Sequence, residues 1–515
     1  MPLKRRYLRM RQDDLAWEKG DKEAETWERS LLKAQVYRDV GSFINQHRPG
    51  DPLELHSPIR GGYNIFFRLE YKDGSSAALR IPCKGIVKCP DEKIRYEVAT
   101  MRYIAENTTI PVAKVYHHGT AAENPTGLGP FIIMDYTEHE RTMSEALNDP
   151  IINSSESHVL DPNVSTEKLE LLYRQMANII LQLSTLTFDR IGSLVQDSDD
   201  VGFHVSGRPL TMNMNSILEF TEAPPSLLPN QQYSTATEWY SALADMHLTQ
   251  LVFQHNDAVE DEEDARDKYV ARQLFRRLAA EGRLVSEFDT KEDGRQSGKE
   301  EEGSFRIFSE DLRPSNVLID KDLRVVGVID WEFAYIAPSQ FSFDPPWWLL
   351  LKAPDEWSDG GYVSWMETYE PRLKTFLRLL DEEEEKKVQA DSGRSISGKQ
   401  EEKVQVDSGR RISGRQQGVR LSQQMRKRWE SRAWMINYAA RSSWAFDFIY
   451  WKFLDAEFFG HNEKGDHHER LGMLTTAEAE AMEQFVRMKM EERNKRALVE
   501  WNDESAAARL AKFIV

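Results

Sequence analysis

Apolar and polar residues alternate with a period of two over two neighbouring stretches in the first hundred residues. The odd-numbered positions from 65 to 71 and from 77 to 81 are apolar, and polar residues occupy most positions between them. This period puts one set of side chains on a single face of a strand. Asp73 and Gly74 lie between the stretches and are typical of a tight hairpin turn with positive φ at both positions. The pattern therefore predicts an antiparallel hairpin.

Other segments repeat their apolar residues every three or four positions, which predicts amphipathic helices. The clearest of these helices follow Pro90 and Ser165. Short uninterrupted apolar runs at 131–134, 317–319 and 325–329 predict buried strands instead. Strands and helices thus share the chain, with strands concentrated in its first part and helices in its second.

Two polar stretches interrupt this pattern, at residues 289–304 and 381–418. Within the second, the segment Val388–Arg394 is repeated almost unchanged as Val404–Arg410. Two copies rich in Glu, Lys, Gln, Ser and Gly cannot bury enough apolar surface to offset chain entropy. The sequence therefore predicts a polar linker at the first stretch and a disordered insert at the second.

Composition narrows the classes of function. The chain has 515 residues, of which 40% are hydrophobic and 30% charged, and its formal net charge is −18. Nucleic-acid binding depends on Lys and Arg, so this balance predicts no nucleic-acid partner. No apolar run is long enough to span a bilayer, which predicts no membrane partner.

Location is predicted from the cysteines and the N-terminus. Cys83 and Cys89 are the only cysteines and cannot form a disulfide scaffold, which favours a reducing compartment. The basic N-terminus has no apolar segment after it, and Asp13, Asp14 and Glu18 interrupt the pattern of a mitochondrial presequence. We therefore expect a cytoplasmic protein.

The stretch from 305 to 351 carries the candidate chemistry. Asp311 and Asn316 come just before the first strand of a predicted hairpin, and Asp330 ends its second strand. A hairpin brings these positions to one edge, where one carboxylate can accept a proton. The amide oxygen and the other carboxylate can hold Mg²⁺ for phosphoryl transfer. The alternative is a polar hairpin with turn-forming Asp and Asn, but its strongly apolar flanks favour a site.

These motifs also resemble a known family. DLRPSNVLID, GVIDWEF and PPWWLL are similar to the aminoglycoside phosphotransferase family, in its fungal branch. The resemblance implies an α+β, protein-kinase-like fold with a small β-rich N-lobe, a large helical C-lobe and disordered insertions. It also implies transfer of the γ-phosphate of ATP or GTP, with Asp311 as catalytic base and Asn316 and Asp330 as ligands of Mg²⁺. Where the family usually has His, two residues before the base, this chain has Ser309.

The predicted N-terminal hairpin supplies candidate nucleotide-binding residues. Gly61 and Gly62 open it, and a glycine backbone can approach phosphates closely, although most hairpins only build sheets. The resemblance matches Arg80 to the phosphate-binding strand Lys and Glu97 to the helix Glu that pairs with it. A solvent-facing Arg and an exposed helix Glu are the alternatives.

The resemblance also organises the chain. It implies that Asp135, Tyr136 and Thr137, which follow a buried strand, form the hinge that contacts the nucleotide base, the alternative being the polar exit of a core strand. We expect three domains: an N-terminal helical extension at 1–54, an N-lobe at 55–138, and a C-lobe at 139–515 that holds the catalytic stretch and the insert.

A run of acidic residues from Glu260 to Asp264 has two interpretations. It could bind a cationic acceptor, or it could be a solvated helix start, where carboxylates are favoured by the helix dipole. The second is favoured because consecutive side chains on a helix point in different directions.

Two hypotheses about function follow. The first is a phosphotransferase that uses ATP or GTP and Mg²⁺ to phosphorylate a hydroxyl or amine of a small-molecule acceptor. The alternative is a catalytically impaired pseudokinase that acts as a nucleotide- or partner-binding module, which Ser309 and Arg80 motivate. Consumption of nucleotide, rather than binding, separates the two.

Overall fold

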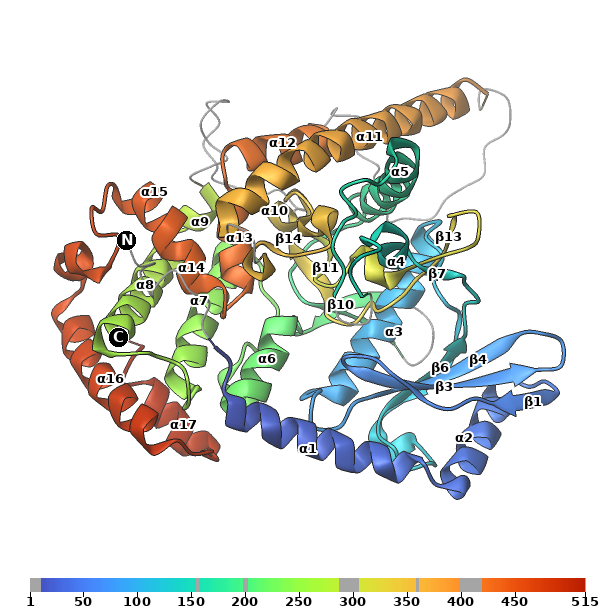
Figure 1. Cartoon of the computed structure of the whole chain (residues 1–515), viewed down its shortest axis with the longest axis horizontal. Helices are drawn as coiled ribbons and strands as arrows, with labels where there is room; N and C mark the ends of the chain where they lie inside the picture. Colours follow the sequence, from blue (N-terminus) through green and yellow to red (C-terminus); the bar gives the residue numbers. More distant parts are fainter. Residues whose placement is uncertain are drawn as a thin grey trace.

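A sheet-rich part and a larger helical part make up the chain in the computed structural model, with α1 running along the lower edge between them (Figure 1). The structure describes residues 11–153, 157–197, 202–286, 305–357, 361–397 and 419–514.

The main sheet is antiparallel throughout. Its strand order is β1-β3-β4-β6-β5, with the short β2 also paired to β3. The strands are β1 (Pro52–Leu55), β2 (Ile59–Arg60), β3 (Asn64–Tyr71), β4 (Ser76–Pro82), β5 (Val115–Gly119) and β6 (Phe131–Asp135). The hairpin predicted from alternation is β3–β4, with Phe67 opposite Leu79, and both side chains are fully buried.

The turn of this hairpin differs from the expected two-residue type. Among its residues only Gly74 has a positive φ, of 83°, and Tyr71 N donates to Ser75 O at 2.9 Å. The loop is therefore longer than two residues, and Asp73 caps it by accepting from Ser75 N at 2.9 Å. Only one glycine position is needed in a turn of this length.

Helix α3 (Pro90–Asn107) packs on the sheet, as the apolar period predicts. Pro90 stands in its first turn, where no backbone donor is needed. Ile94 and Val98 form a small buried cluster with Ile132 of β6. Lys93 and Glu97, each one position before these two residues, are also buried and are described below.

Two N-terminal helices, α1 (Asp14–Leu31) and α2 (Ala34–His47), join the two parts. Phe43 of α2 packs edge-on against Phe131 of the sheet at 4.9 Å between ring centroids. Trp17 of α1 lies against Phe220 of α6 at 5.6 Å. The first sheet strand begins directly after these helices, at Pro52.

The helical part has one continuous core. Its helices are α4 (Met143–Leu147), α5 (Thr166–Leu183), α6 (Met212–Thr221), α7 (Ala236–Phe253), α8 (Glu262–Ala280), α9 (Arg283–Ser286), α10 (Ser339–Ser342), α11 (Gly361–Ser397), α12 (Leu421–Glu430), α13 (Trp434–Arg441), α14 (Phe446–Ile449), α15 (Asp455–Phe459), α16 (Thr476–Lys495) and α17 (Asp503–Leu510). Aromatic side chains fill much of this core, as in the stacked pairs Trp365–Tyr369 at 4.4 Å and Trp429–Trp434 at 5.5 Å.

Short strands in the helical part hold the predicted catalytic stretch. β11 pairs with β14 and β8, whereas β12 pairs with β13 and β7. Their bounds are β7 (Arg141–Thr142), β8 (Thr187–Phe188), β9 (Ser193–Gln196), β10 (Phe203–Gly207), β11 (Phe305–Ser309), β12 (Val317–Ile319), β13 (Val325–Val328) and β14 (Ala334–Pro338). The hairpin expected from the sequence is therefore β12–β13, in which Val317 lies opposite Val328.

The predicted disordered insert starts too early. Residues 381–397 continue helix α11, while residues 398–418, like the linker at 287–304, lie outside the described residues. Glu and Lys are good helix formers, and tertiary contacts hold this end of the helix. Glu383 pairs with Arg174 of α5 at 3.1 Å, and Glu384 accepts from Leu421 N of α12 at 2.6 Å.

Candidate active site

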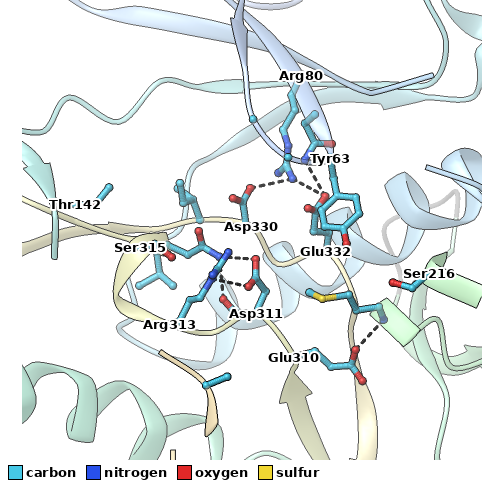
Figure 2. Close-up of a pocket in the computed structure, with 18 of the residues that line it drawn as sticks. Tyr63, Arg80, Thr142, Ser216, Glu310, Asp311, Arg313, Ser315, Asp330 and Glu332 are labelled. Carbon is cyan, nitrogen blue, oxygen red and sulfur yellow. Dashed lines mark hydrogen bonds and ion pairs between the residues drawn. The ribbon is translucent and has the colours of Figure 1, made fainter. Parts of the chain in front are cut away.

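A cavity of about 730 Å³ lies between the main sheet and the catalytic stretch. Most of the residues selected from the sequence line it: Gly61, Gly62, Arg80, Asp135, Tyr136, Thr137, Asp311, Asn316 and Asp330. Glu97 is the exception, because it is buried behind Arg80 and is not part of the lining. Residues more than 200 positions apart in the sequence thus face one space (Figure 2).

Asp311 and Asn316 are locked together by the loop before β12. Asn316 Nδ2 donates to both the main-chain oxygen and Oδ2 of Asp311, each at 2.8 Å. Arg313 Nε lies 2.7 Å from Asp311 Oδ1 (Figure 2). Burial raises the pKa of Asp311 to about 6, although Arg313 and Asn316 act in the opposite direction. This carboxyl group is therefore a proton acceptor close to neutral pH.

Asp330 leaves the second hairpin strand next to this pair. Ile329 N donates to Asn316 O at 2.9 Å, so the residue before Asp330 is fixed opposite Asn316. Asp330 itself has a φ of 57°, a left-handed conformation that is uncommon outside glycine and that Asp tolerates better than most residues. Burial raises its pKa, opposed by the charge of Arg80. With this backbone conformation, Asp330 lines the cavity.

Arg80 bridges the sheet, α3 and the catalytic stretch. Its guanidinium lies 2.6 Å from Glu97 Oε1, 3.0 Å from Asp330 Oδ1 and 2.9 Å from Glu332 Oε2. Arg80 and Glu97 are almost inaccessible to solvent. The strand cation and helix carboxylate matched by resemblance are thus in direct contact, and the planar fork of Arg allows the bridging.

Two residues that sequence reasoning did not select complete this network. Lys93 Nζ pairs with Glu332 and donates to Asn64 Oδ1 at 2.8 Å. Glu332 also accepts from Asn64 Nδ2 at 2.8 Å. Lys93 stands one helical turn before Glu97, so the two side chains share a face of α3. Glu332 lies beyond the end of β13, and no local spacing indicates its contact with Lys93.

Buried charges in this network are held by one another. Burial opposes ionisation of Glu332, but Lys93 and Arg80 outweigh it and lower the pKa of Glu332. Burial dominates at Glu97 and raises the pKa of that carboxyl group. We call Arg80, Lys93, Glu97, Asp330 and Glu332 the charge cluster. Two cations face three carboxylates there.

The glycine hairpin and the hinge line the other end of the cavity. Gly61 N donates to Asn64 O at 2.8 Å, and a Cβ added at Gly62 would meet no atom within 4 Å. Asp135 N and Tyr136 N both donate within the protein, at 2.9 and 3.1 Å, to main-chain oxygens of neighbouring segments. Open space therefore adjoins the hairpin, while the hinge is tied to the sheet.

Ser309 is the last residue of β11, and Glu310 follows it directly before Asp311. Ser309 Oγ is buried and has no hydrogen-bond partner among the described residues. Ser309 also lines a small separate cavity of about 90 Å³. Glu310 accepts from Met212 N at 2.7 Å, and burial raises its pKa to about 7. At the position where the family usually has His, this chain therefore has a smaller side chain beside a cavity, and its hydroxyl has no hydrogen-bond partner among the described residues.

Comparison with known proteins supports the resemblance that the motifs suggest. Residues 216–380 match the model of the phosphotransferase enzyme family. This segment contains Asp311, Asn316 and Asp330, and the match confirms the predicted likeness to the aminoglycoside phosphotransferases. The chain has the α+β, protein-kinase-like fold expected from the sequence, with a small β-rich lobe and a large helical lobe.

The curated relatives found by sequence are fungal, as expected. The chain is 26% identical over 167 residues to the Zygosaccharomyces rouxii protein "Altered inheritance of mitochondria protein 9, mitochondrial". It is 27% identical over 139 residues to an Aspergillus fumigatus subtelomeric hrmA-associated cluster protein. These matches cover 32% and 27% of this chain and only 25% and 24% of the relatives.

The chain is also similar to a solved structure, at low sequence identity. An aminoglycoside phosphotransferase in ternary complex with AMP-PNP and hygromycin B is 15% identical, with a TM-score of 0.36. The alignment covers 70% of this chain and 95% of that one.

One expectation is overturned. The cytoplasmic location predicted from the sequence is contradicted by the yeast relatives, whose names describe them as mitochondrial. Separately, none of the helices that the structure describes is long and apolar enough to cross a membrane.

Proposed function

We propose that the protein transfers the γ-phosphate of ATP or GTP to a hydroxyl or amine of a small-molecule acceptor. One observation carries the proposal. Asp311, Asn316 and Asp330 converge on a single cavity, and Arg80, which the sheet supplies, contacts the last of them at 3.0 Å. A polar hairpin with a purely structural role would not need these groups beside an opening of this size.

The donor set fits Mg²⁺. Both amide hydrogens of Asn316 are used on Asp311, which leaves its Oδ1 as the atom to ligate a metal. Together with a carboxylate oxygen of Asp330, this offers the hard oxygen ligands that Mg²⁺ prefers. Bound there with the nucleotide, the metal would neutralise charge on the phosphates.

We assign the role of general base to Asp311. Its raised pKa, about 6, lets the carboxylate accept a proton from an acceptor hydroxyl near neutral pH. Arg313 and Asn316 hold its two oxygens and fix its orientation toward the cavity. The residue thereby acts on the acceptor, while Asn316 and Asp330 act on the nucleotide.

We place the nucleotide between the hinge and the glycine hairpin. Because Asp135 N and Tyr136 N donate to protein oxygens, Thr137 is the hinge residue whose main chain we assign to the base. The open space beside Gly62 is assigned to phosphates. Arg80, 3.0 Å from Asp330, is the cation that we assign to the phosphates.

The second candidate is a nucleotide-binding pseudokinase, which the incompletely bonded Ser309 favours. Asp311→Asn separates the two candidates, because Asn keeps the shape and can still accept from Asn316. General-base assistance is worth about 10²–10⁴-fold. A kinase should lose phosphoryl transfer by about that factor with nearly unchanged nucleotide affinity.

The assay is ADP release over a panel of hydroxyl- and amine-bearing metabolites, with Mg-ATP and Mg-GTP binding followed by thermal shift. Asp322→Asn, in the exposed turn of the same hairpin, is the matched control and should behave as wild type. Wild-type turnover equal to that of Asp311→Asn across the panel, despite Mg-nucleotide binding, would establish the pseudokinase instead.

A further inference from the structure

Two histidines and a glutamate meet in the helical part, on elements that do not line the active-site cavity. His467 and His468 open the short 3-10 helix η8 (His467–Met473), and Glu263 lies in the first turn of α8. Among the described residues, these three side chains are of types that bind metals, and each offers one ligand atom that lies within 4.8 Å of the other two. They lie about 200 positions apart in sequence.

The ligand atoms are spaced for a shared ion rather than for direct hydrogen bonds. Oε2 of Glu263 lies 3.6 Å from His468 Nε2 and 4.0 Å from His467 Nε2. Hydrogen bonds of this kind have lengths of about 2.7–3.2 Å. Ligands about 2.0–2.1 Å from a tetrahedral Zn²⁺ stand about 3.3 Å apart, so a small closure of this group would bring all three atoms to an ion.

Carboxylates orient both imidazoles with their Nε2 atoms toward Glu263. His467 Nδ1 lies 2.8 Å from Asp267 Oδ1, and His468 Nδ1 lies 3.2 Å from Asp466 Oδ1. An ionised carboxylate only accepts, so each Nδ1 carries a proton, and in the neutral imidazole Nε2 then presents its lone pair. A carboxylate behind each imidazole is the arrangement that supports metal-bound histidines.

Glu263 is oriented by an arginine. Its other oxygen, Oε1, accepts from Arg266 at 3.2 Å, which leaves Oε2 toward the histidines. His467 is buried, whereas Glu263 and His468 are exposed on their outer sides. Three protein ligands with one exposed side leave a position for water, which makes a four-coordinate ion.

We propose that Glu263, His467 and His468 bind a Zn²⁺ ion that ties η8 to the start of α8. Imidazole nitrogens with one carboxylate suit Zn²⁺ better than Mg²⁺ or Ca²⁺, which prefer all-oxygen ligands. The ion would cross-link the C-terminal segment to the helical core, far along the chain from the phosphotransferase residues. The proposal is therefore independent of the function proposed above.

The test uses the full-length, tag-free protein after chelator treatment, titrated with ZnCl₂ by calorimetry. The expected result is one Zn²⁺ per chain at this site and a melting temperature that rises with Zn²⁺. His468→Ala and Glu263→Gln should abolish this binding. Asp466→Asn keeps an oxygen that can cap η8 but replaces the carboxylate that orients His468, and it should weaken binding about 10–100-fold.

Glu262→Gln is the matched control, because Glu262 is equally exposed, neighbours Glu263 and contacts only Arg266 in the structure's ion pairs. Its affinity for Zn²⁺ should equal that of wild type. Co²⁺ provides a second readout, with the intense visible absorption of a four-coordinate ion in wild type and its loss in His468→Ala. Stoichiometric binding absent from wild type, or equally tight in folded His468→Ala, would overturn the proposal.

Discussion

Lys93 is the residue whose removal best tests the charge cluster. Its side chain is inaccessible to solvent, and it contacts Glu332 and Asn64. Lys93→Met keeps an unbranched chain of similar length and removes the charge together with the hydrogen bond to Asn64. Breaking a buried ion pair from one side costs about 3–5 kcal/mol because the other charge stays buried. Glu332 would still have Arg80 at 2.9 Å and Asn64 at 2.8 Å. We therefore expect the free energy of unfolding to fall by about 3 kcal/mol.

The measurement is urea unfolding followed by fluorescence, compared at equal protein concentration. A loss of about 3 kcal/mol is about a 10²-fold fall in the folding equilibrium constant. Lys84→Met serves as the surface control, since Lys84 is exposed and lies 3.8 Å from its partner Glu23. Surface changes of that kind usually stay within about 0.5 kcal/mol.

A double variant separates lost charge balance from lost packing. Lys93→Met with Glu332→Gln removes both partners, so no carboxylate is left without its cation, and part of the stability should return. The reasoning would be refuted if Lys93→Met unfolded at the same urea concentration as Lys84→Met. It would also fail if the double variant lost, relative to wild type, as much stability as the two single variants lose together.

Two further predictions concern catalysis. Because the pKa of Asp311 is raised to about 6, protonation removes the base as the pH falls through that value, so kcat/KM for the acceptor should decline on the acid side. Initial rates across that range should show this limb in wild type, and a flat profile there would contradict the assignment of the base. Ser309→His should leave ADP release equal or higher, because Ser309 lines a cavity of about 90 Å³ and its hydroxyl is unsatisfied. A rate as low as that of Asp311→Asn would contradict this expectation.

Local patterns in the sequence were sufficient for much of the fold. Alternation over 65–71 and 77–81 predicted β3 and β4, and the apolar period after Pro90 predicted α3. These elements obey rules that act within a few residues, so no tertiary information was needed. The contact between Asp311 and Asn316 was predictable for the same reason, because one short loop sets the distance between the two side chains.

Other features depend on contacts between distant segments and could not be predicted. Composition alone suggested disorder from residue 381, yet Arg174 and Leu421 hold α11 beyond that point. Lys93 offered the opposite difficulty. A lysine in an amphipathic helix is normally solvated, and only the position of Glu332, over 200 residues away, explains its burial.

The charge cluster also changes how Arg80 bears on the choice between enzyme and pseudokinase. A lysine at this position would place one point charge, whereas the guanidinium of Arg80 reaches Glu97 with one nitrogen and Asp330 and Glu332 with another. If Asp330 turned to a metal, Glu332 would still satisfy that nitrogen, and Lys93 would still balance Glu332. Arg80 thus keeps a cation at the cavity, and Lys93, which does not line it, balances Glu332 from behind. Of the two departures that motivate the pseudokinase, only Ser309 then retains its force.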